Sequence, residues 1–307
     1  MQNIPLGLVG VGKIALDQHL PAIDASPFRL TATADPHAGL KTLPAYTSLQ
    51  DMLDAEPSIE AVAICTPTHL RFAQAYLAIS RGKHVLLEKP PGATLSEVDA
   101  LTAHARRQGV TLFAAWHSRF APGVASARQW LANRTVKQVR IEWKEDVRVW
   151  HPGQAWIWQP GGMGVFDPGI NALSIATAIL PEPFFLQRAR LAVPSNCQTP
   201  IAASLSFTDA QGAGIEAQFD FHQQGEPTWD IHIDTDSGRL SLTRGGRCLN
   251  IANTPVIDEE EREYIGVYAH FAELVGSATS DVDVSPLRHV ADAFLYGHRD
   301  MTDAFTE

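Results

Sequence analysis

The sequence has little cysteine, no excess of positive charge and no long apolar run. Its three cysteines, Cys65, Cys197 and Cys248, are too few and too scattered for a disulfide framework or a zinc site. Lys and Arg number 24 against 34 Asp and Glu, and the net charge of -10 disfavours a nucleic-acid or anionic-membrane surface. No apolar run reaches the ~18 residues of a membrane-spanning helix, and no basic segment precedes the first apolar stretch as in a secretory signal. We therefore expect a cytoplasmic protein with no nucleic-acid or membrane partner.

Two common catalytic motifs are also missing. The 12 histidines form no H-E-x-x-H element and no close cluster with Cys or Asp, so the sequence predicts no catalytic metal. No G-x-S-x-G element occurs, which weakens a hydrolase interpretation. The chain has 307 residues, a length that predicts about two domains. Its composition, 45% hydrophobic and 19% charged, is typical of a globular protein.

Short apolar runs alternate with helical patterns over residues 1–120. One of the predicted helices has a capping box, Thr94 with Glu97, and a terminal glycine, Gly109. Strands that are apolar on both faces and alternate with helices are typical of a doubly wound parallel sheet. The expected strands are residues 6–9, 30–34, 61–65, 84–87 and 110–115.

The pattern changes near residue 120. Apolar and polar residues now alternate, which is typical of strands with one buried and one wet face. We therefore expect a parallel α/β domain over residues 1–120 and an α+β domain with an open, largely antiparallel sheet over residues 121–307. The last segment, 284–305, has an apolar helical face and is predicted to be a helix. The alternating stretches are residues 139–143, 215–221, 229–233 and 240–242.

A glycine-rich turn follows the first predicted strand and opens a helix. Gly10-Val11-Gly12-Lys13-Ile14-Ala15 is a G-x-G-x-x-A form of the dinucleotide fingerprint. Gly10 would make the tight turn, Gly12 would leave room for a pyrophosphate, and Ala15 would let the helix pack closely on the strand. The helix N-terminus adds N–H donors and a partial positive charge for the phosphates. The first domain is thus predicted to be a dinucleotide-binding Rossmann domain.

Asp35 ends the second predicted strand, near the distance from Gly10 at which a carboxylate binds the ribose hydroxyls of NAD. Such a carboxylate repels the 2′-phosphate of NADP, and Pro36 follows it where an arginine could have bound that phosphate. We therefore expect NAD as the preferred cofactor and NADP as the alternative. His37 could soften the preference, and a simple Asp-Pro turn is the plainer interpretation of Asp35.

Two more groups of polar residues are candidates for chemistry. Glu88-Lys89-Pro90-Pro91 follows the fourth strand, and the carboxyl ends of parallel strands face the ligand crevice. Asp167 and Asn171 follow a glycine-rich run four residues apart, so they would share one helix face and suit a polyol substrate. The plainer alternatives are a surface salt bridge at Lys89 and a helix cap with a buried polar residue at Asp167.

Six of the seven tryptophans lie between residues 116 and 158. Core packing accounts for most of them, and we expect only Trp150, beside His151, and Trp229 to form walls against a ligand ring. Trp229 begins an alternating strand, so a core position is its alternative. His117 follows the fifth strand and Glu145 flanks the loop after the first strand of the second domain, which makes both candidate substrate contacts.

Together these elements resemble the Gfo/Idh/MocA oxidoreductase family, whose members join an N-terminal Rossmann domain to a C-terminal domain with an open sheet. The glycine-rich turn, Thr66-Pro67, the run from Gly82 to Pro90 and the segment from Gly161 to Asn171 occur in the family's order. The resemblance implies that Lys89 works near the nicotinamide and the substrate. The cofactor-binding residues implied are Gly10, Gly12, Lys13, Ile14, Asp35, His37, Thr66, Pro67, His69, Glu88 and Lys89.

Two positions depart from the family pattern. Arg71 stands where many members have histidine. Asn171 stands where most have the histidine of an Asp-x-x-x-His pair, so the usual imidazole acid/base is absent there. The catalytic candidates are then Lys89, Asp167 and Asn171. We favour Lys89 as the proton acceptor or the electrostatic partner of the reacting oxygen, with Asp167 holding the reacting hydroxyl or Lys89, and Asn171 binding a ring hydroxyl. The reverse assignment makes Asp167 the base.

Longer motifs resemble the aldose 1-dehydrogenase branch of the family, among them residues 12–23, 116–119 and 143–153. This resemblance implies NAD(P)-dependent oxidation of C1 of L-arabinose, D-galactose or both to the lactone. It also implies a small-molecule aldose partner and makes the exposed face of the open sheet a candidate homodimer surface. Another sugar, inositol or polyol dehydrogenase and a non-catalytic sugar sensor are the alternatives. The substrate contacts implied are His117, Glu145, Trp150, Asn171 and Trp229.

Overall fold

The computed structural model describes residues 3–306. The chain divides into two compact units, Met1–His117 with Tyr264–Val284, and Ser118–Glu263 with Ser285–Glu307. The sequence predicts one boundary near residue 120, and the first stretch of the first unit ends at His117. The return of Tyr264–Val284 to the first unit is not part of the two consecutive domains expected from the sequence.

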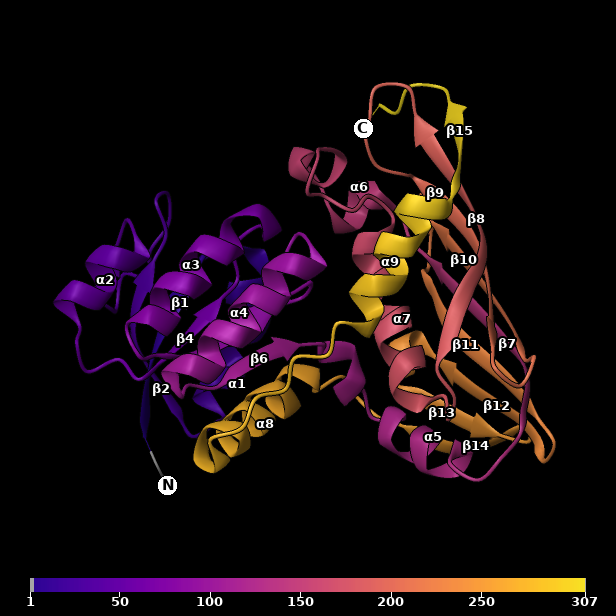
Figure 1. Cartoon of the computed structure of the whole chain (residues 1–307), viewed down its shortest axis with the longest axis horizontal. Helices are drawn as coiled ribbons and strands as arrows, with labels where there is room; N and C mark the ends of the chain where they lie inside the picture. Colours follow the sequence, from indigo (N-terminus) through magenta and orange to yellow (C-terminus); the bar gives the residue numbers. More distant parts are fainter. Residues whose placement is uncertain (1–2, 307) are drawn as a thin grey trace. The chain divides into compact units, whose positions relative to one another are not determined.

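The first unit is built on a six-stranded parallel sheet, indigo to magenta in Figure 1. Its strand order, β3-β2-β1-β4-β5-β6, is the Rossmann order. All five predicted strands are present, which confirms a doubly wound α/β fold. The two-residue strand β3 was not predicted because so short a segment shows no periodicity. The strands are β1 (Ile4–Val9), β2 (Phe28–Ala34), β3 (Ala45–Tyr46), β4 (Ala61–Ile64), β5 (His84–Glu88) and β6 (Leu112–Ala115).

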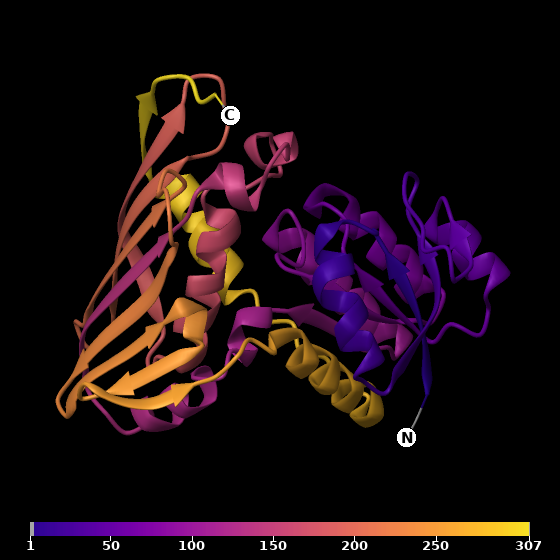
Figure 2. The same cartoon turned by 180° about the vertical axis from the view of Figure 1, so that it is seen from behind.

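Helices cover both faces of this sheet (Figures 1 and 2). Leu112 of β6 joins the core cluster formed with α2, α3 and α4. Its neighbour Phe113 packs on Phe271 of α8, with ring centroids 6.2 Å apart. Successive strand residues point to opposite faces, so α8 covers the face opposite α3 and α4. The helical segments are η1 (Ala15–His19), α1 (Leu20–Asp24), α2 (Leu49–Ala55), α3 (Thr68–Ser80), α4 (Leu95–Gln108) and α8 (Glu263–Ser277).

The caps of α4 are those expected from the sequence. The Thr94 side chain accepts the N–H of Glu97, and Gly109 ends the helix with φ 67°, a left-handed conformation that favours glycine.

The second unit is built on a nine-stranded mixed sheet in the order β14-β13-β12-β11-β7-β10-β9-β8-β15, counted over residues 3–306. Only the pairs β10–β7 and β15–β8 are parallel, which confirms the expected open, largely antiparallel sheet. The four alternating stretches of the sequence form β7, β10, β11 and β12. The strands are β7 (Val136–Lys144), β8 (Phe184–Pro194), β9 (Ala202–Asp209), β10 (Gly214–Asp220), β11 (Thr228–Thr235), β12 (Gly238–Thr243), β13 (Cys248–Ile251), β14 (Thr254–Asp258) and β15 (His298–Thr302).

The longer helices of the second unit pack on one face of this sheet (Figure 1). Polar residues of β7, β9, β10 and β11 occupy the other face, as the alternating burial of these strands shows. The helical segments are η2 (His117–Phe120), α5 (Val124–Leu131), α6 (Val147–Trp150), η3 (Ala155–Trp158), α7 (Phe166–Ile179), η4 (Arg244–Gly246) and α9 (Ser285–Tyr296).

The prediction of one helix over residues 284–305 is wrong in its second half. The helix α9 ends at Tyr296, and after Gly297 the chain forms β15, which pairs in parallel with β8. The predicted apolar face ends earlier as well, since Leu295 is 88% exposed. Glycine weakens a helix, and the free edge of β8 supplies the hydrogen bonds that a longer helix would have made.

Candidate active site

The glycine-rich turn of the first unit connects β1 to η1 in the geometry that a dinucleotide requires. Gly10 has φ +85°, and a Cβ at this residue would lie 2.9 Å from the backbone nitrogen of Thr66. A Cβ at Gly12 would meet nothing within 4 Å, so the backbone there is open to a ligand. Ala15 is fully buried beneath the turn. These residues therefore fit a pyrophosphate approaching the backbone.

Asp35 follows β2 and is tied to the same turn. Its Oδ2 accepts the N–H of Val11 at 2.9 Å, and its Oδ1 accepts the N–H groups of His37 and Ala38 at 2.8 and 3.0 Å. Partial burial acts to raise the pKa of Asp35, but these three backbone donors outweigh it and hold the pKa below its usual value. The carboxylate is thus charged and fixed at the site where the sequence places the ribose.

The other cofactor candidates occupy different surroundings in the first unit. Thr66 is buried beside Gly10, and its hydroxyl donates to Gln74 at 2.5 Å. Lys13 pairs with Asp17 one helical turn further on, in an exposed position. Ile14 and His69 are exposed, and Pro67 is half-buried at the start of α3. The structure therefore brings Gly10, Asp35 and Thr66 to one edge of the sheet.

Glu88, at the end of β5, is the centre of a buried polar network that sequence reasoning missed. It is 2% exposed, and its Oε1 accepts the hydroxyl of Tyr264 at 2.5 Å and lies 3.0 Å from Nε2 of His19. The opposite oxygen, Oε2, accepts the N–H of Lys89 at 2.8 Å. Nδ1 of His19 lies 2.8 Å from the hydroxyl of Tyr268. The network fixes the residue that precedes Lys89.

The groups of this network shift one another's protonation. Burial acts to lower the pKa of His19, but Cys65, Tyr268 and Glu88 beside it raise that pKa well above its usual value. Burial acts to raise the pKa of Glu88, but His19 holds it well below the usual range. Burial raises the pKa of Tyr268 to about 12, so this hydroxyl stays protonated. Glu88 and His19 therefore form a buried ion pair.

His117 was expected among the substrate contacts and lies just past β6. Its ring stacks on Tyr264, with centroids 5.2 Å apart and planes 17° apart. His117 thus extends the aromatic side of the Glu88 network in the first unit.

The second unit holds a cluster of two carboxylates and an imidazole, which we call the Glu145–His151–Asp167 cluster. Glu145 follows β7 and is 3% exposed, and Asp167 lies in the first turn of α7 and is 7% exposed. Nε2 of His151 lies 3.4 Å from Oε1 of Glu145 and 3.9 Å from Oδ2 of Asp167. A titratable imidazole therefore lies between two buried acceptors, as in sites of proton transfer.

Two tryptophans surround this cluster. Trp229 of β11 donates its indole N–H to Oε2 of Glu145 at 2.9 Å and is half-buried. Trp150 packs edge-to-face on Trp229, with ring centroids 5.0 Å apart, and is 43% exposed. An exposed indole beside buried carboxylates presents an apolar face and hydrogen-bond acceptors together, a combination that suits a sugar ring.

Asn171 lies one turn after Asp167 on α7 and is half-buried, so the two share a helix face as expected. The turn that leads into this helix depends on Gly164, which has φ +55°. A Cβ at Gly164 would lie 2.2 Å from the carbonyl oxygen of Pro200, so only glycine fits.

The structure groups the candidate residues by unit. Glu145, Trp150, Asp167 and Trp229 come together in the second unit, with Asn171 one turn away. His151 is the residue that sequence reasoning missed, since it was noted only as the neighbour of Trp150. A histidine six residues after Glu145, in the segment that follows β7, could have signalled it.

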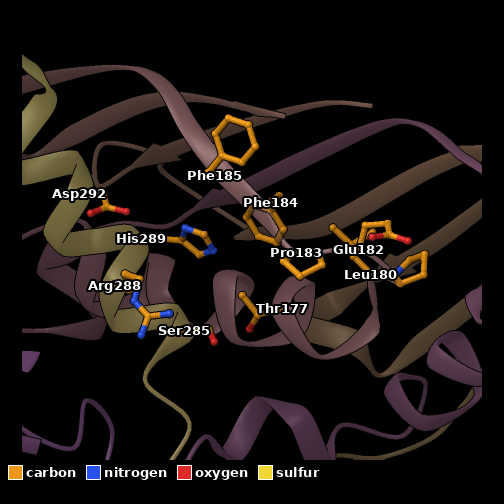
Figure 3. Close-up of a pocket in the computed structure, with 11 residues that line it drawn as sticks. Thr177, Leu180, Glu182, Pro183, Phe184, Phe185, Ser285, Arg288, His289 and Asp292 are labelled. Atoms are coloured by element: carbon orange, nitrogen blue, oxygen red, sulfur yellow. The ribbon is translucent and has the colours of Figure 1, made fainter. Parts of the chain in front are cut away.

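A separate cavity of about 350 Å³ lies at the other end of α7 (Figure 3). His289 of α9 stacks there on Phe184 of β8, with ring centroids 4.4 Å apart. The lining includes one cation, Arg288, and two carboxylates, Glu182 and Asp292, so it carries charges of both signs. It shares no lining residue with the Glu145–His151–Asp167 cluster.

Two further findings apply to residues 3–306. They contain no group of three or more His, Cys, Asp or Glu side chains that could hold a metal ion. None of their helices is both long enough and apolar enough to cross a membrane.

Comparison with known proteins agrees with this architecture. The family model GFO_IDH_MocA, described as an oxidoreductase family with an NAD-binding Rossmann fold, matches residues 4–116. The galactose 1-dehydrogenase of Pseudomonas fluorescens is 49% identical over 306 residues, 99% of each chain. The crystal structure of a D-galactose-1-dehydrogenase protein from Rhizobium etli superposes with a TM-score of 0.96 at 53% identity, covering 100% of this chain and 99% of that one.

More distant structures share the fold alone. A levoglucosan dehydrogenase, solved with NADH and L-sorbose, has a TM-score of 0.80 at 19% identity and covers 96% of this chain and 95% of its own. Because the relatives at about half identity match from end to end, the expected family is confirmed. The chain belongs to the Gfo/Idh/MocA family of oxidoreductases with an NAD-binding Rossmann fold.

Proposed function

We propose that the chain is an NAD(P)-dependent aldose 1-dehydrogenase that oxidises C1 of D-galactose, L-arabinose or both to the lactone. The observation that carries this proposal is the end-to-end match, at 49% and 53% identity, to two galactose 1-dehydrogenases. D-galactose and L-arabinose have the same ring configuration at C2, C3 and C4 and differ by a hydroxymethyl group at C5. A site that binds the shared hydroxyls and leaves room at C5 accepts both.

The Glu145–His151–Asp167 cluster supports a sugar substrate. Two buried carboxylates are acceptors for sugar hydroxyls, and the exposed indole of Trp150 offers a face for the C–H side of the ring. Asn171 adds an amide that both donates and accepts. The proposal therefore assigns the sugar to the second unit.

The cofactor is assigned to the first unit, because its residues fit a dinucleotide. Gly12 leaves the backbone open, and the charged carboxylate of Asp35 is held where ribose hydroxyls can donate to it. The same charge repels a 2′-phosphate, so we propose NAD as the preferred cofactor and NADP as the weaker one. When bound, the cofactor supplies the acceptor for the hydride that leaves C1.

The chain's own residues handle the proton of the C1 hydroxyl. Oxidation of an aldose removes a hydride from C1 and a proton from its hydroxyl oxygen, and leaves the lactone carbonyl. We assign Lys89 as the acceptor of that proton, Asp167 as the group that orients the hydroxyl, and Asn171 as a ligand of a ring hydroxyl. His151 restores an imidazole beside Asp167, although position 171 lacks one, and holds this carboxylate toward Glu145.

The test is a panel of aldoses assayed with NAD and with NADP, following the near-ultraviolet absorbance of the reduced cofactor and trapping the lactone. The proposal expects kcat/KM to be highest for D-galactose or L-arabinose, with lactone formed in step with NADH. Turnover of an inositol or acyclic polyol without lactone would show another dehydrogenase of the family. Sugar binding without turnover would show a sensor.

Two broader expectations belong to the same proposal. The polar face of the nine-stranded sheet, uncovered by helices within its unit, is the candidate homodimer surface. A cytoplasmic location remains the expectation from the sequence.

A further inference from the structure

Arg71 is a buried cation that donates hydrogen bonds to three backbone carbonyls. It lies in the first turn of α3 and is 6% exposed. Its Nε donates to the carbonyl of Thr66 at 2.8 Å, and its Nη1 donates to the carbonyls of Glu88 and Pro90, the first at 2.6 Å. The positive charge of Arg71 also favours the ionised carboxylate of Glu88, so its charge and its hydrogen bonds both act on the segment around Lys89.

The carbonyls that Arg71 binds are those on either side of Lys89. Glu88 and Pro90 are its two chain neighbours, so one guanidinium nitrogen bridges the peptide groups before and after the lysine. The third carbonyl, that of Thr66, belongs to the turn that follows β4, beside Gly10. Arg71 therefore links the end of β5 to the cofactor turn through the backbone.

The side chain of Glu88 fixes the same segment from the other direction. Its carboxylate accepts the N–H of Lys89 and is itself held by His19 and Tyr264. The backbone of Lys89 is thus bound at its own N–H and at the carbonyls of both neighbours. The lysine side chain is half-buried, and the direction in which it leaves the backbone is set by this fixed segment.

A guanidinium suits this position because its donors form a rigid planar fork. Two separate nitrogens reach two strand ends at once, whereas an ammonium is a point donor on a flexible stem. An imidazole, the group that many family members have at this position, is shorter and presents two donors at most. Arg71 can therefore bind all three carbonyls, which a histidine at this position could not.

We propose that Arg71 is a positioning residue for Lys89, setting the direction of its side chain by holding the carbonyls of Glu88 and Pro90. The inference rests on the proposed function only in that Lys89 is assigned there to proton transfer. A lysine displaced by about 1 Å loses roughly 10²-fold in rate, the scale measured for misplaced catalytic groups. Binding of NAD should change little, because the bond from Arg71 to the cofactor turn goes to the backbone carbonyl of Thr66 and not to a side chain.

The experiment compares Arg71→Ala, Arg71→Lys and, as a matched control, Arg81→Ala at the end of the same helix, where the arginine forms an exposed pair with Asp54. We expect kcat to fall about 10²-fold in Arg71→Ala, with KM for NAD near the wild-type value. Guanidinium ion at non-denaturing concentration should restore much of kcat in Arg71→Ala but not in Lys89→Ala. Arg81→Ala should match the wild type.

Two results would overturn the inference. One is a folded Arg71→Lys or Arg71→Ala with wild-type kcat. The other is a loss of kcat and of NAD affinity together, without rescue by guanidinium, which would show a purely structural role. If Arg71→Ala does not fold, Arg71→Lys carries the test, because it keeps the charge and loses the fork.

A second readout separates this inference from the proposed function. Reductive amine labelling of the apo protein, quantified by peptide mass spectrometry, gives the reaction rate of Lys89 relative to the exposed Lys13. We expect this ratio to rise in Arg71→Lys and to stay unchanged in Arg81→Ala. An unchanged ratio in Arg71→Lys contradicts the positioning role, whatever the sugar assays show. A raised ratio in a protein that oxidises no aldose upholds positioning and refutes the proposed function.

Discussion

Replacing His19 by glutamine should weaken the first unit and leave the second unit unchanged. His19 is fully buried, and both of its ring nitrogens have partners, Glu88 at 3.0 Å and Tyr268 at 2.8 Å. Removing it takes away the cation that contacts the buried carboxylate of Glu88, although the charge of Arg71 still acts on that carboxylate. Glutamine is close to histidine in size and keeps an amide donor, so the change tests the charge more than the packing.

The magnitude follows from burial. Removing one partner of a buried ion pair costs roughly 3–5 kcal/mol, because the remaining charge is uncompensated. Here the Tyr264 hydroxyl and the Lys89 N–H still donate to Glu88, so we expect the lower end, about 3 kcal/mol in the free energy of unfolding. That corresponds to about a 10²-fold change in the unfolding equilibrium.

The pH dependence has a definite sign. The pKa of His19 is raised above 6.5 in the fold, so its contribution is fully present below pH 6.5 and is lost as pH rises through the raised value. The pKa of Glu88 is lowered from 4.5, so its contribution is present above pH 4.5 and is lost as pH falls. The difference between wild type and His19→Gln should therefore be largest between pH 4.5 and 6.5 and shrink at alkaline pH.

Urea unfolding followed by tryptophan fluorescence and by far-ultraviolet circular dichroism measures the loss of stability in each unit. Trp116 is the single tryptophan of the first unit, and the other six lie in the second, so fluorescence reports mainly the second unit and far-ultraviolet circular dichroism reports both. In His19→Gln the dichroism transition should begin at lower urea while the fluorescence transition stays in place. The exposed His37→Gln serves as the control. A variant whose free energy of unfolding is within about 1 kcal/mol of wild type, roughly the error of such measurements, or one whose difference is independent of pH, would refute the buried ion pair.

Three other changes test the assigned roles. Asp35→Asn keeps an acceptor for Val11 but removes the charge. The free-energy preference for NAD over NADP, calculated from the ratio of their kcat/KM values, should therefore fall by about 1–2 kcal/mol. An unchanged ratio would show that Asp35 does not select the cofactor. Lys89→Ala should lower kcat by about 10²–10⁴-fold with NAD binding retained in calorimetry; near wild-type kcat would move the base to Asp167. Trp150→Ala should raise KM for the sugar without changing KM for NAD, and equal damage to both would indicate a structural tryptophan.

Local chemistry explains which parts of the fold could be predicted. The turn at Gly10 and the caps of α4 are set by residues within a few positions of each other, so the sequence is sufficient. The strand β8 was not predicted because a register shift between Leu186 and Arg188 interrupts its alternation of apolar and polar residues. The strand β15 was not predicted because its pairing with β8 is decided by the partner strand and not by its own short sequence.

In the candidate site, too, features set by local spacing could be predicted and features set by distant partners could not. Asp167 and Asn171 could be placed on one helix face because their spacing alone determines it. The contact of His151 with Glu145 and Asp167 depends on how the loop after β7 folds, which has no periodic signal. The partners of Glu88 could not be found from the sequence, since His19 is separated from it by 69 residues and Tyr264 by 176 residues.

The return of α8 has a consequence for synthesis of the chain. Tyr268 and Phe271 are fully buried in the first unit, where Phe271 stacks on Phe28 at 5.1 Å. A ribosome that has released residues 1–120 has therefore produced a sheet on which the apolar surface around Phe28 and Phe113 is uncovered, and a carboxylate, Glu88, that lacks its tyrosine donor. That surface stays exposed until α8 emerges, after most of the second unit has been made, so the nascent Rossmann sheet is a natural client for chaperones while the second unit is being translated.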